Sequence, residues 1–301
     1  MTRAFVTHNC LSEILMTRVP STNPVYFQKQ LRRLRKHPEI IVGAVVVLSW
    51  LLLSLLAPLI APFDPLEQHI KDRLQAPNQT YLLGTDELGR DILSRILYGG
   101  RITIPAGLAV VIIDGIIGWL IGAIAGFLGG IWDEVMMRLT ELFMAFPTII
   151  LAMAITAALG PSIRNAVLAL VIVRWPNYAR LTRGLIIEAK THEYVEAARS
   201  LGAKRPYLLF KTLLPNSIAP TVVYGSLDIG NAILIFAGLS FLGLGPEPSS
   251  PEWGRMISIG IDFFDQWWMW LFPGLAIASL VMAFNFIGDG LRDMLDPRLG
   301  S

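Results

Sequence analysis

Two aspartates occur where the surrounding sequence is otherwise apolar. Asp114 is the one charged residue in the run 102–132, and Asp228 is the one charged residue in the run 217–244. A carboxylate at membrane depth is costly unless it faces a polar cavity, finds a partner or stays protonated. Both aspartates are therefore functional candidates, and Asn231 lies one helical turn after Asp228.

The motifs of nucleotide and hydrolytic chemistry are absent from the sequence. It has no G-x-x-x-x-G-K-[ST] loop, so it lacks the backbone cradle and the lysine that hold nucleotide phosphates. H-E-x-x-H and G-x-S-x-G are also absent. The single cysteine, Cys10, cannot form an intrachain disulfide, and no cysteine or histidine cluster has metal-ligand spacing. We therefore expect no catalytic residue, no metal site and no cofactor bound by this chain.

The composition indicates an all-α membrane protein. Of the 301 residues, 53% are hydrophobic and 16% are charged, which is too apolar for an ordinary soluble domain. The net charge of +2 is too near balance to favour binding of nucleic acid. Windows of about 20 apolar residues can each cross a bilayer as a helix. We predict six spans, at residues 40–63, 102–126, 142–163, 165–180, 217–244 and 266–287.

The distribution of Lys and Arg predicts the orientation. Basic residues gather ahead of the first span, in residues 29–36, and again in residues 180–211. Such residues mark the cytoplasmic side, so six crossings place both termini in the cytoplasm. We divide the chain into a cytoplasmic N-terminal segment, 1–39, and a transmembrane domain, 40–301. A cleaved signal peptide is disfavoured because the first apolar run is long. Translation could begin at Met1 or at Met16.

The most informative segment is the cytoplasmic loop 188–216. Its first part, up to Leu201, consists of good helix formers, and Gly202 lies where a helix end needs a positive φ. A second short helix can begin near Pro206 and end before Pro215. We expect two short helices at an angle that could lie against another protein. The alternative is an amphipathic helix that rests on anionic lipid.

This loop resembles the EAA motif of permease subunits of ATP-binding cassette (ABC) importers. The matching residues are Glu196-Ala197-Ala198, Gly202 and Leu214-Pro215, and Thr212 departs from the isoleucine usual there. In that family the loop is the coupling helix, which docks into a groove on a separate ATPase subunit. The resemblance implies a coupling role for Glu196, Ala197, Ala198, Gly202, Ala203, Leu208, Leu214 and Pro215.

Three further stretches resemble the dipeptide, oligopeptide and nickel permease group: residues 83–101, 238–256 and 288–298. The group implies a type I ABC importer permease fold in a prokaryotic inner membrane. It also implies four kinds of partner: a homologous second permease, two ABC ATPase subunits that use ATP and Mg, an extracytoplasmic solute-binding protein, and the lipid bilayer. In this family the fifth span lines the translocation path, so Asp228, Asn231 and Asp114 are its candidates.

The stretch 83–101 can also be interpreted from its residues alone. Residues 84–101 can form an amphipathic helix along the outer surface, with charged side chains paired at three- and four-residue spacing. A receptor could dock on such a rim, for which the candidates are Asp86, Arg90, Asp91 and Trp253. A purely structural interfacial helix explains each of these residues equally well.

Glycines recur every four residues in the second predicted span, at Gly118, Gly122, Gly126 and Gly130. This spacing predicts a helix face that another helix approaches closely.

The function that follows is import of a small solute, with di- or oligopeptides favoured and nickel or another small solute as the alternative. A proton-driven secondary transporter is a third possibility, with Asp114 and Asp228 as proton carriers. No inverted repeat of the kind often found in such transporters is visible.

Overall fold

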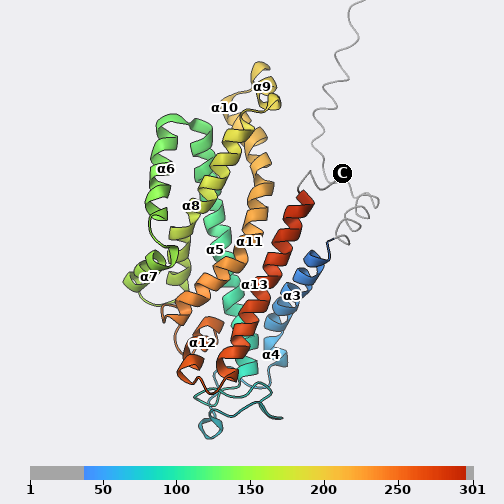
Figure 1. Cartoon of the computed structure of the whole chain (residues 1–301), viewed down its shortest axis with the longest axis vertical. Helices are drawn as coiled ribbons and strands as arrows, with labels where there is room; N and C mark the ends of the chain where they lie inside the picture. The colour runs from blue at the N-terminus through green and yellow to red at the C-terminus, as the bar shows by residue number, and fades with distance from the viewer. Residues whose placement is uncertain (1–36, 296–301) are drawn as a thin grey trace, which may run out of the picture.

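The computed structural model describes residues 37–295, and its regular elements there are helices (Figure 1). The predicted segment 1–39 lies almost wholly outside this range. In chain order the elements are α3 (Pro38–Leu55), α4 (Ala57–Ile60), η1 (Ile70–Asp72), α5 (Ile92–Leu128), α6 (Gly130–Met144), α7 (Thr148–Leu159), α8 (Ile163–Ala189), α9 (Glu193–Ser200), α10 (Arg205–Tyr207), the π-helical η2 (Leu208–Leu213), α11 (Leu214–Phe241), α12 (Trp253–Asp262) and α13 (Trp268–Leu295).

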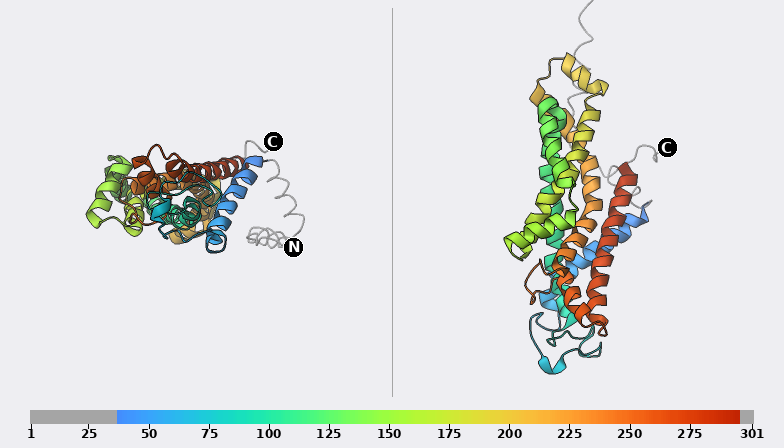
Figure 2. Two further views of the ribbon diagram at one scale, coloured as in Figure 1. Left: turned by 90° about the horizontal axis from the view of Figure 1, so that it is seen from below. Right: turned by 60° about the vertical axis from the view of Figure 1, so that its left-hand side comes forward.

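The long helices lie side by side along the long axis of the molecule. Helix α5 packs against α8 and α11, α11 packs against α13, and α13 packs against α3 (Figures 1 and 2). Helices α9 and α10 lie at one end of this bundle, and the irregular segment 61–91 and α12 lie at the other. Large hydrophobic side chains remain exposed along the helices, as expected for faces that contact lipid.

The described helices confirm a membrane protein but not the exact number of spans. Helix α3, helix α5, the run Arg205–Phe241 and helix α13 are long and apolar enough to cross a bilayer. Helices α6 and α7 together would form a fifth span, and they bend by 86° at the break between them. Helix α8 has 27 residues, among them several arginines and other polar residues, and is not in this set. The six-span count therefore stays a prediction.

The start of α5 corrects the predicted surface helix at residues 84–101. Residues 84–91 form an irregular segment, and α5 runs without interruption from Ile92 to Leu128. The helix begins at Ile92 because the Asp91 carboxylate accepts hydrogen bonds from the backbone N–H and the hydroxyl of Ser94, at 2.8 and 2.6 Å. Residues 92–101 are thus the first ten residues of a helix long and apolar enough to span a membrane and do not form a separate helix.

Three other predicted boundaries differ for local reasons. The predicted span 142–163 is divided between α6 and α7, because Pro147 follows the end of α6 and cannot continue it. Helix α8 extends to Ala189, beyond the predicted end near residue 180. The predicted helix 188–201 is α9, which begins at Glu193 after a turn.

The glycine face of α5 packs directly on α8, as the sequence predicts for three of its four residues. A Cβ added at Gly122 would clash with the carbonyl of Ala179, and one at Gly118 would clash with the carbonyl of Trp175. Gly126 approaches the carbonyl of Arg183, and Gly130 lies beyond this face in open space. The two backbones therefore approach closely enough for extensive van der Waals contact.

Candidate functional site

The residues of the predicted cytoplasmic loop form a bent projection, which we call the coupling segment (residues 190–213) after its predicted role. Helix α9 ends at a turn where Gly202 has φ +85°, the positive value that the sequence predicts. The chain then continues as one helical run from Arg205 to Phe241 and passes through Pro215 without a break. The predicted helix end before Pro215 is wrong, because proline is tolerated in the first turn of α11.

The coupling segment is anchored by one apolar face and exposed on the other. Val195, Leu208 and Leu213 are buried against the adjacent ends of α5 and α8, in a cluster that includes Ala123 and Ile186. The predicted coupling residues divide between these faces: Leu208 and Leu214 are buried, Ala198 and Ala203 are half-buried, and Glu196, Ala197, Gly202 and Pro215 are exposed.

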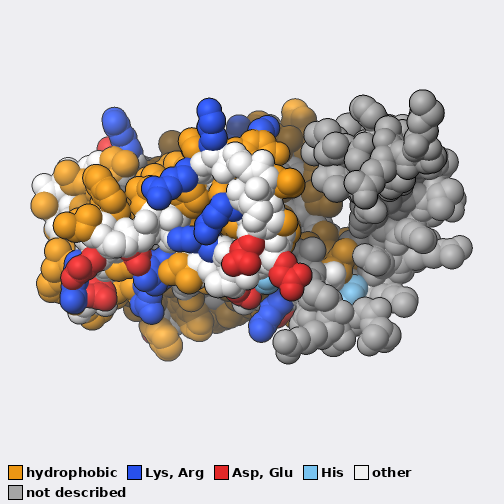
Figure 3. Space-filling view, turned by 90° about the horizontal axis from the view of Figure 1, so that it is seen from above, with side chains coloured by type: hydrophobic (Ala, Val, Ile, Leu, Met, Phe, Trp, Pro, Cys, Tyr) orange, Lys and Arg blue, Asp and Glu red, His pale blue; other side chains and the backbone are white. Residues whose placement is uncertain are grey.

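The exposed face of the coupling segment combines charged and large apolar side chains. Leu201 is 90% exposed, and Phe210 and Tyr207 are 62% and 56% exposed. Figure 3 looks onto this end and shows Lys and Arg side chains spread over it, with fewer Asp and Glu side chains and hydrophobic side chains between them. Apolar side chains with a charged surround are typical of a protein interface.

The two aspartates within the spans converge on one arginine. Arg174 of α8 donates from Nε to Asp114 Oδ2 of α5 at 3.2 Å, and its Nη2 bonds Asp228 Oδ2 of α11. The Tyr178 hydroxyl also donates to Asp228 Oδ2, at 3.0 Å, and Asn231 Nδ2 lies 3.4 Å from Oδ1. We call Asp114, Arg174, Tyr178 and Asp228 the membrane network. All four are buried, and Asn231 is exposed beside them.

A hollow of about 460 Å³ opens beside the membrane network. It is lined by residues of α5 and α11, among them Gly115 and Gly225, and by Tyr178 of α8. The lining is apolar apart from hydroxyl groups such as those of Tyr178 and Ser226. The hollow thus has the size of a ligand site and reaches the membrane network at Tyr178, whereas Asp114, Asp228 and Asn231 do not line it.

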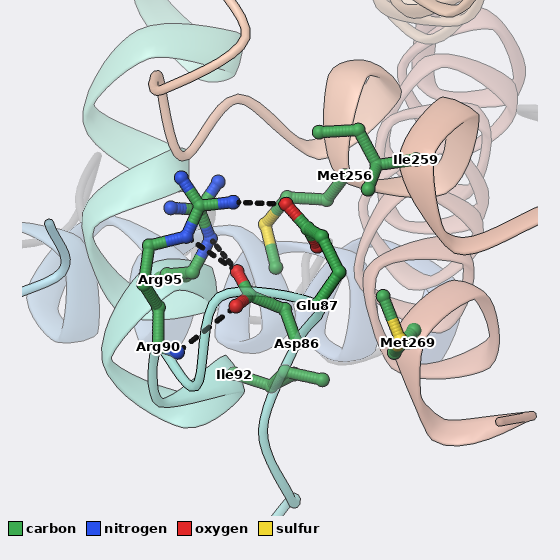
Figure 4. Close-up of a pocket in the computed structure, with 8 residues that line it drawn as sticks. All are labelled: Asp86, Glu87, Arg90, Ile92, Arg95, Met256, Ile259 and Met269. Carbon is green, nitrogen blue, oxygen red and sulfur yellow. Dashed lines mark hydrogen bonds and ion pairs between the residues drawn. The ribbon is translucent and has the colours of Figure 1, made fainter. Parts of the chain in front are cut away.

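The candidate residues for receptor docking lie at the opposite end and are buried. Asp86, Arg90 and Asp91 are 5%, 2% and 2% exposed, and Trp253 is fully buried. Arg90 donates to Asp86 at 2.6 Å and to Glu87 at 2.8 Å, around a pocket of about 10 Å³ (Figure 4). These side chains support this end of the molecule from beneath its surface, and direct contact with a receptor stays a prediction.

The rim is tied to the rest of the molecule by two further residues. Arg95 donates to the carbonyls of Pro65, Ser249 and Ser250 at 3.1 to 3.3 Å. The carboxylate of Glu252 accepts from the backbone N–H groups of Gly254 and Arg255, which begins α12. Burial raises the pKa of Glu252, and burial also raises the pKa of Glu87.

Sequence reasoning does not include Arg174 or Arg95 among the site residues, although it gives Arg174 and Glu141 as possible neighbours of Asp114, and Arg174 is the one that the structure pairs with it. Arg174 was visible as a charge that interrupts the predicted fourth span, and a charge at membrane depth is itself a functional signal. Arg95 was placed in a surface helix, where its pairing would count for little. In the structure its side chain is 1% exposed.

One group of possible metal ligands lies among the described residues. His37, Glu39 and Asp293 bring ligand atoms within 4.8 Å of one another, where α3 begins and α13 ends. His37 Nδ1 lies 2.8 Å from the Glu39 carboxylate. That pairing accounts for two of the three residues without a metal ion.

Comparison with known proteins identifies what this architecture is similar to. Residues 118–301 match the family described as binding-protein-dependent transport system inner membrane component, and residues 26–77 match the N-terminal TM domain of oligopeptide transport permease C. A probable D,D-dipeptide transport system permease protein of Escherichia coli is 43% identical, over 93% of this chain and 97% of its own. Dipeptide transport system permease proteins of Haemophilus influenzae and E. coli are 44% and 42% identical, over 86% and 96% of this chain and 90% and 97% of theirs.

Proposed function

Because the chain belongs to the family of inner membrane components of binding-protein-dependent transport systems, it is a permease subunit of an ABC importer, and we propose that this importer carries dipeptides. The relatives named above support dipeptides as the substrate, since they are named as dipeptide permeases and are 42 to 44% identical over most of the chain. Longer oligopeptides come next, and nickel or another small solute is the alternative. The chain is a transport subunit, and ATP hydrolysis belongs to a separate subunit.

The coupling segment is the part of the chain that we assign to the ATPase. The observation that carries this assignment is Leu201, whose side chain is 90% exposed at the turn beside Gly202 while Val195 and Leu208 anchor the same segment. Burial of so exposed an apolar side chain in a partner protein would be favourable, because it removes apolar surface from water. Glu196, Ala197 and Gly202 lie on this exposed surface.

The proposed orientation places both termini in the cytoplasm. Helix α3 begins, and helix α13 ends, toward the end of the bundle where α9 lies (Figure 1). Arg199, Lys204, Arg205 and Lys211 are exposed at that end, which is the pattern of a cytoplasmic face. The cap formed by residues 61–91 and α12 would then face the solute-binding protein outside.

The complete importer would contain this chain, a homologous second permease, two ATPase subunits and an extracytoplasmic binding protein. The ATPases would bind ATP with Mg, and no cofactor or nucleic acid would bind this chain. The translocation path would run along the hollow beside Asp228 and Asn231, with Asp114 behind it. ATP binding would move the coupling segment and open the path outward, and hydrolysis would reverse this movement. Such coupling requires that the two conformations contact the ATPase differently.

Reconstitution tests this function. The complex is placed in vesicles with its ATPase subunits and ATP inside and with its binding protein and labelled dipeptide outside, and accumulation of labelled dipeptide in the lumen is measured. We expect accumulation only when ATP, ATPase subunits and binding protein are all present. Competition with nickel and with longer peptides defines the substrate. Uptake driven by a proton gradient through this chain alone would contradict the proposal.

A further inference from the structure

Helices α5 and α8 form one rigid pair around the membrane network. Their backbones approach at Gly118 and Gly122, where a Cβ on α5 would clash with the main chain of α8. Such contact leaves little freedom for the two helices to slide or separate. Asp114 on α5 and Arg174 on α8 therefore move together.

Helix α11 meets this pair less tightly around Gly225, whereas farther along it packs closely, through Ile233, on Gly107 of α5. A Cβ added at Gly225 would lie 3.6 Å from the Tyr178 hydroxyl, which is ordinary van der Waals contact, and the hollow of about 460 Å³ lies along the same seam. The direct polar links across it are those from Arg174 and Tyr178 to Asp228 and one from Trp119 Nε1 of α5 to the Ser217 hydroxyl at 2.9 Å. Separating α11 from the pair thus breaks fewer close contacts than separating α5 from α8.

Helix α11 is also the direct continuation of the coupling segment. The helical run that begins at Arg205 reaches Phe241, and Asp228 lies roughly 20 Å along α11 from Leu214 at 1.5 Å per residue. A displacement of the coupling segment therefore reaches the seam through a continuous helix.

The charges of the network do not balance. One guanidinium, that of Arg174, faces two carboxylates, and the hydroxyls of Tyr178 and Tyr224 are the other titratable groups beside it. Asp228 takes hydrogen bonds from Arg174 and Tyr178, whereas Asp114 takes one from Arg174 alone. Within residues 37–295, Asp114 Oδ1 is buried and has no hydrogen-bond partner. A buried hydrogen-bond acceptor without a donor destabilises the folded protein. The unpaired Oδ1 of Asp114 therefore needs an explanation.

We propose that Arg174 is a positioning residue for alternating access: it holds α11 through Asp228 in this conformation and stays paired with Asp114 when α11 moves away. The open Oδ1 of Asp114 is then the acceptor that Arg174 uses in the second conformation. Without it, movement of α11 would leave a guanidinium unpaired at membrane depth, which is strongly unfavourable. This inference rests on the proposed function of the chain as an ABC permease.

The test uses the reconstituted complex and the variant Asp114→Asn, which keeps the size of the side chain and the Arg174–Asp228 pair. We expect dipeptide uptake to fall about tenfold or more, because the second conformation loses a charge-assisted hydrogen bond. Thermal stability without nucleotide should stay near that of the wild type. Asp133→Asn is the matched control, because Asp133 pairs with Arg183 outside the network and joins α6 to α8.

A distance measurement separates a positioning role from a merely structural one. Spin labels at Ile172 of α8 and Val222 of α11, both exposed, report the seam after Cys10 is replaced by Ser. Wild type should show a second, longer distance on ATP binding, and Asp114→Asn should stay at the first. Equal distances and equal uptake in the two proteins would overturn the inference. If the wild-type complex itself shows no ATP-dependent uptake, the proposed function fails instead.

The charge-neutral triple variant addresses folding. Arg174→Met alone leaves two carboxylates buried without their partner and can prevent folding. Combined with Asp114→Asn and Asp228→Asn, it removes every charge of the network at once. We expect this protein to fold and to hydrolyse ATP with little uptake. Wild-type uptake per ATP in the folded triple variant would contradict the proposal.

Discussion

Within residues 37–295 two buried clusters combine aspartate with arginine, and they differ in how far apart their members lie in the sequence. The outer cluster joins Asp86, Arg90 and Arg95, which are close neighbours in the chain. The membrane network joins Asp114 and Asp228 through Arg174, over separations of 60 and 54 residues. The first cluster fixes the shape of one end of the molecule. The second links helices that we propose move relative to each other.

Arg95→Met tests whether the outer cluster holds this end of the molecule in shape. Of the variants considered, it should lower stability the most. Arg95 is 1% exposed and donates to three carbonyls in two segments that are distant in the sequence. Removing it should lower the free energy of unfolding by about 3–5 kcal/mol. Thermal unfolding in detergent measures the change, with the exposed Arg101→Met as control. Equal melting temperatures for both variants would show that the rim does not depend on this cluster.

Tyr178→Phe tests the membrane network by removing one hydrogen-bond donor. Its hydroxyl lies 3.0 Å from Asp228 Oδ2 in a buried site. A hydrogen bond to a charged group stabilises by about 1.5–3 kcal/mol, so unfolding should become easier by that amount. The same thermal measurement applies, with the exposed Tyr207→Phe as control. A variant as stable as wild type would mean that Asp228 does not need this donor.

Gly202→Pro should uncouple ATP hydrolysis from dipeptide uptake. Gly202 has φ +85°, which proline cannot adopt, so the turn after α9 must change shape. We expect uptake to fall by about tenfold, equivalent to about 1.4 kcal/mol, while ATP hydrolysis continues. Gly160→Pro is the control, since Gly160 has φ +89° and lies at the end of α7. Comparable losses in both variants would argue for general misfolding.

The pH dependence of Glu252 should give the smallest effect. Burial raises its pKa above the ordinary value, so the folded state holds the proton more tightly than the unfolded state. Stability that Glu252 contributes is therefore present below the ordinary pKa and is lost as the pH rises through the raised one. Relative to Glu252→Gln, the wild type should gain stability as the pH is lowered through that window. A difference that does not change with pH would contradict the raised pKa.

The sequence predicted local features better than distant contacts. The positive φ of Gly202 and the glycine face of α5 follow from residue type and helical spacing, and the structure confirms both. The predicted start of this span, residue 102, follows the apolar window, whereas α5 begins ten residues earlier, at the Asp91 cap. Pro147 is visible in the sequence as a residue that interrupts helices, yet the predicted span 142–163 includes it.

The membrane network could be predicted only in part. Each aspartate was recognisable because a charge in an apolar run is unusual. Their meeting at Arg174 depends on how α5, α8 and α11 pack, which no local pattern specifies. The burial of Asp86 and Arg90 was missed for the same reason, since segments distant in the sequence cover them.

The central claim is that an ATPase subunit holds the coupling segment, and cross-linking from Leu201 tests it most directly. A photoreactive residue at this position, which is 90% exposed, is compared in the assembled transporter with one at Leu59, which is 82% exposed at the other end. We predict a cross-link from position 201 to the ATPase, with a yield that changes on ATP binding, and none from position 59. A fully active transporter in which position 201 labels only phospholipid would contradict the claim.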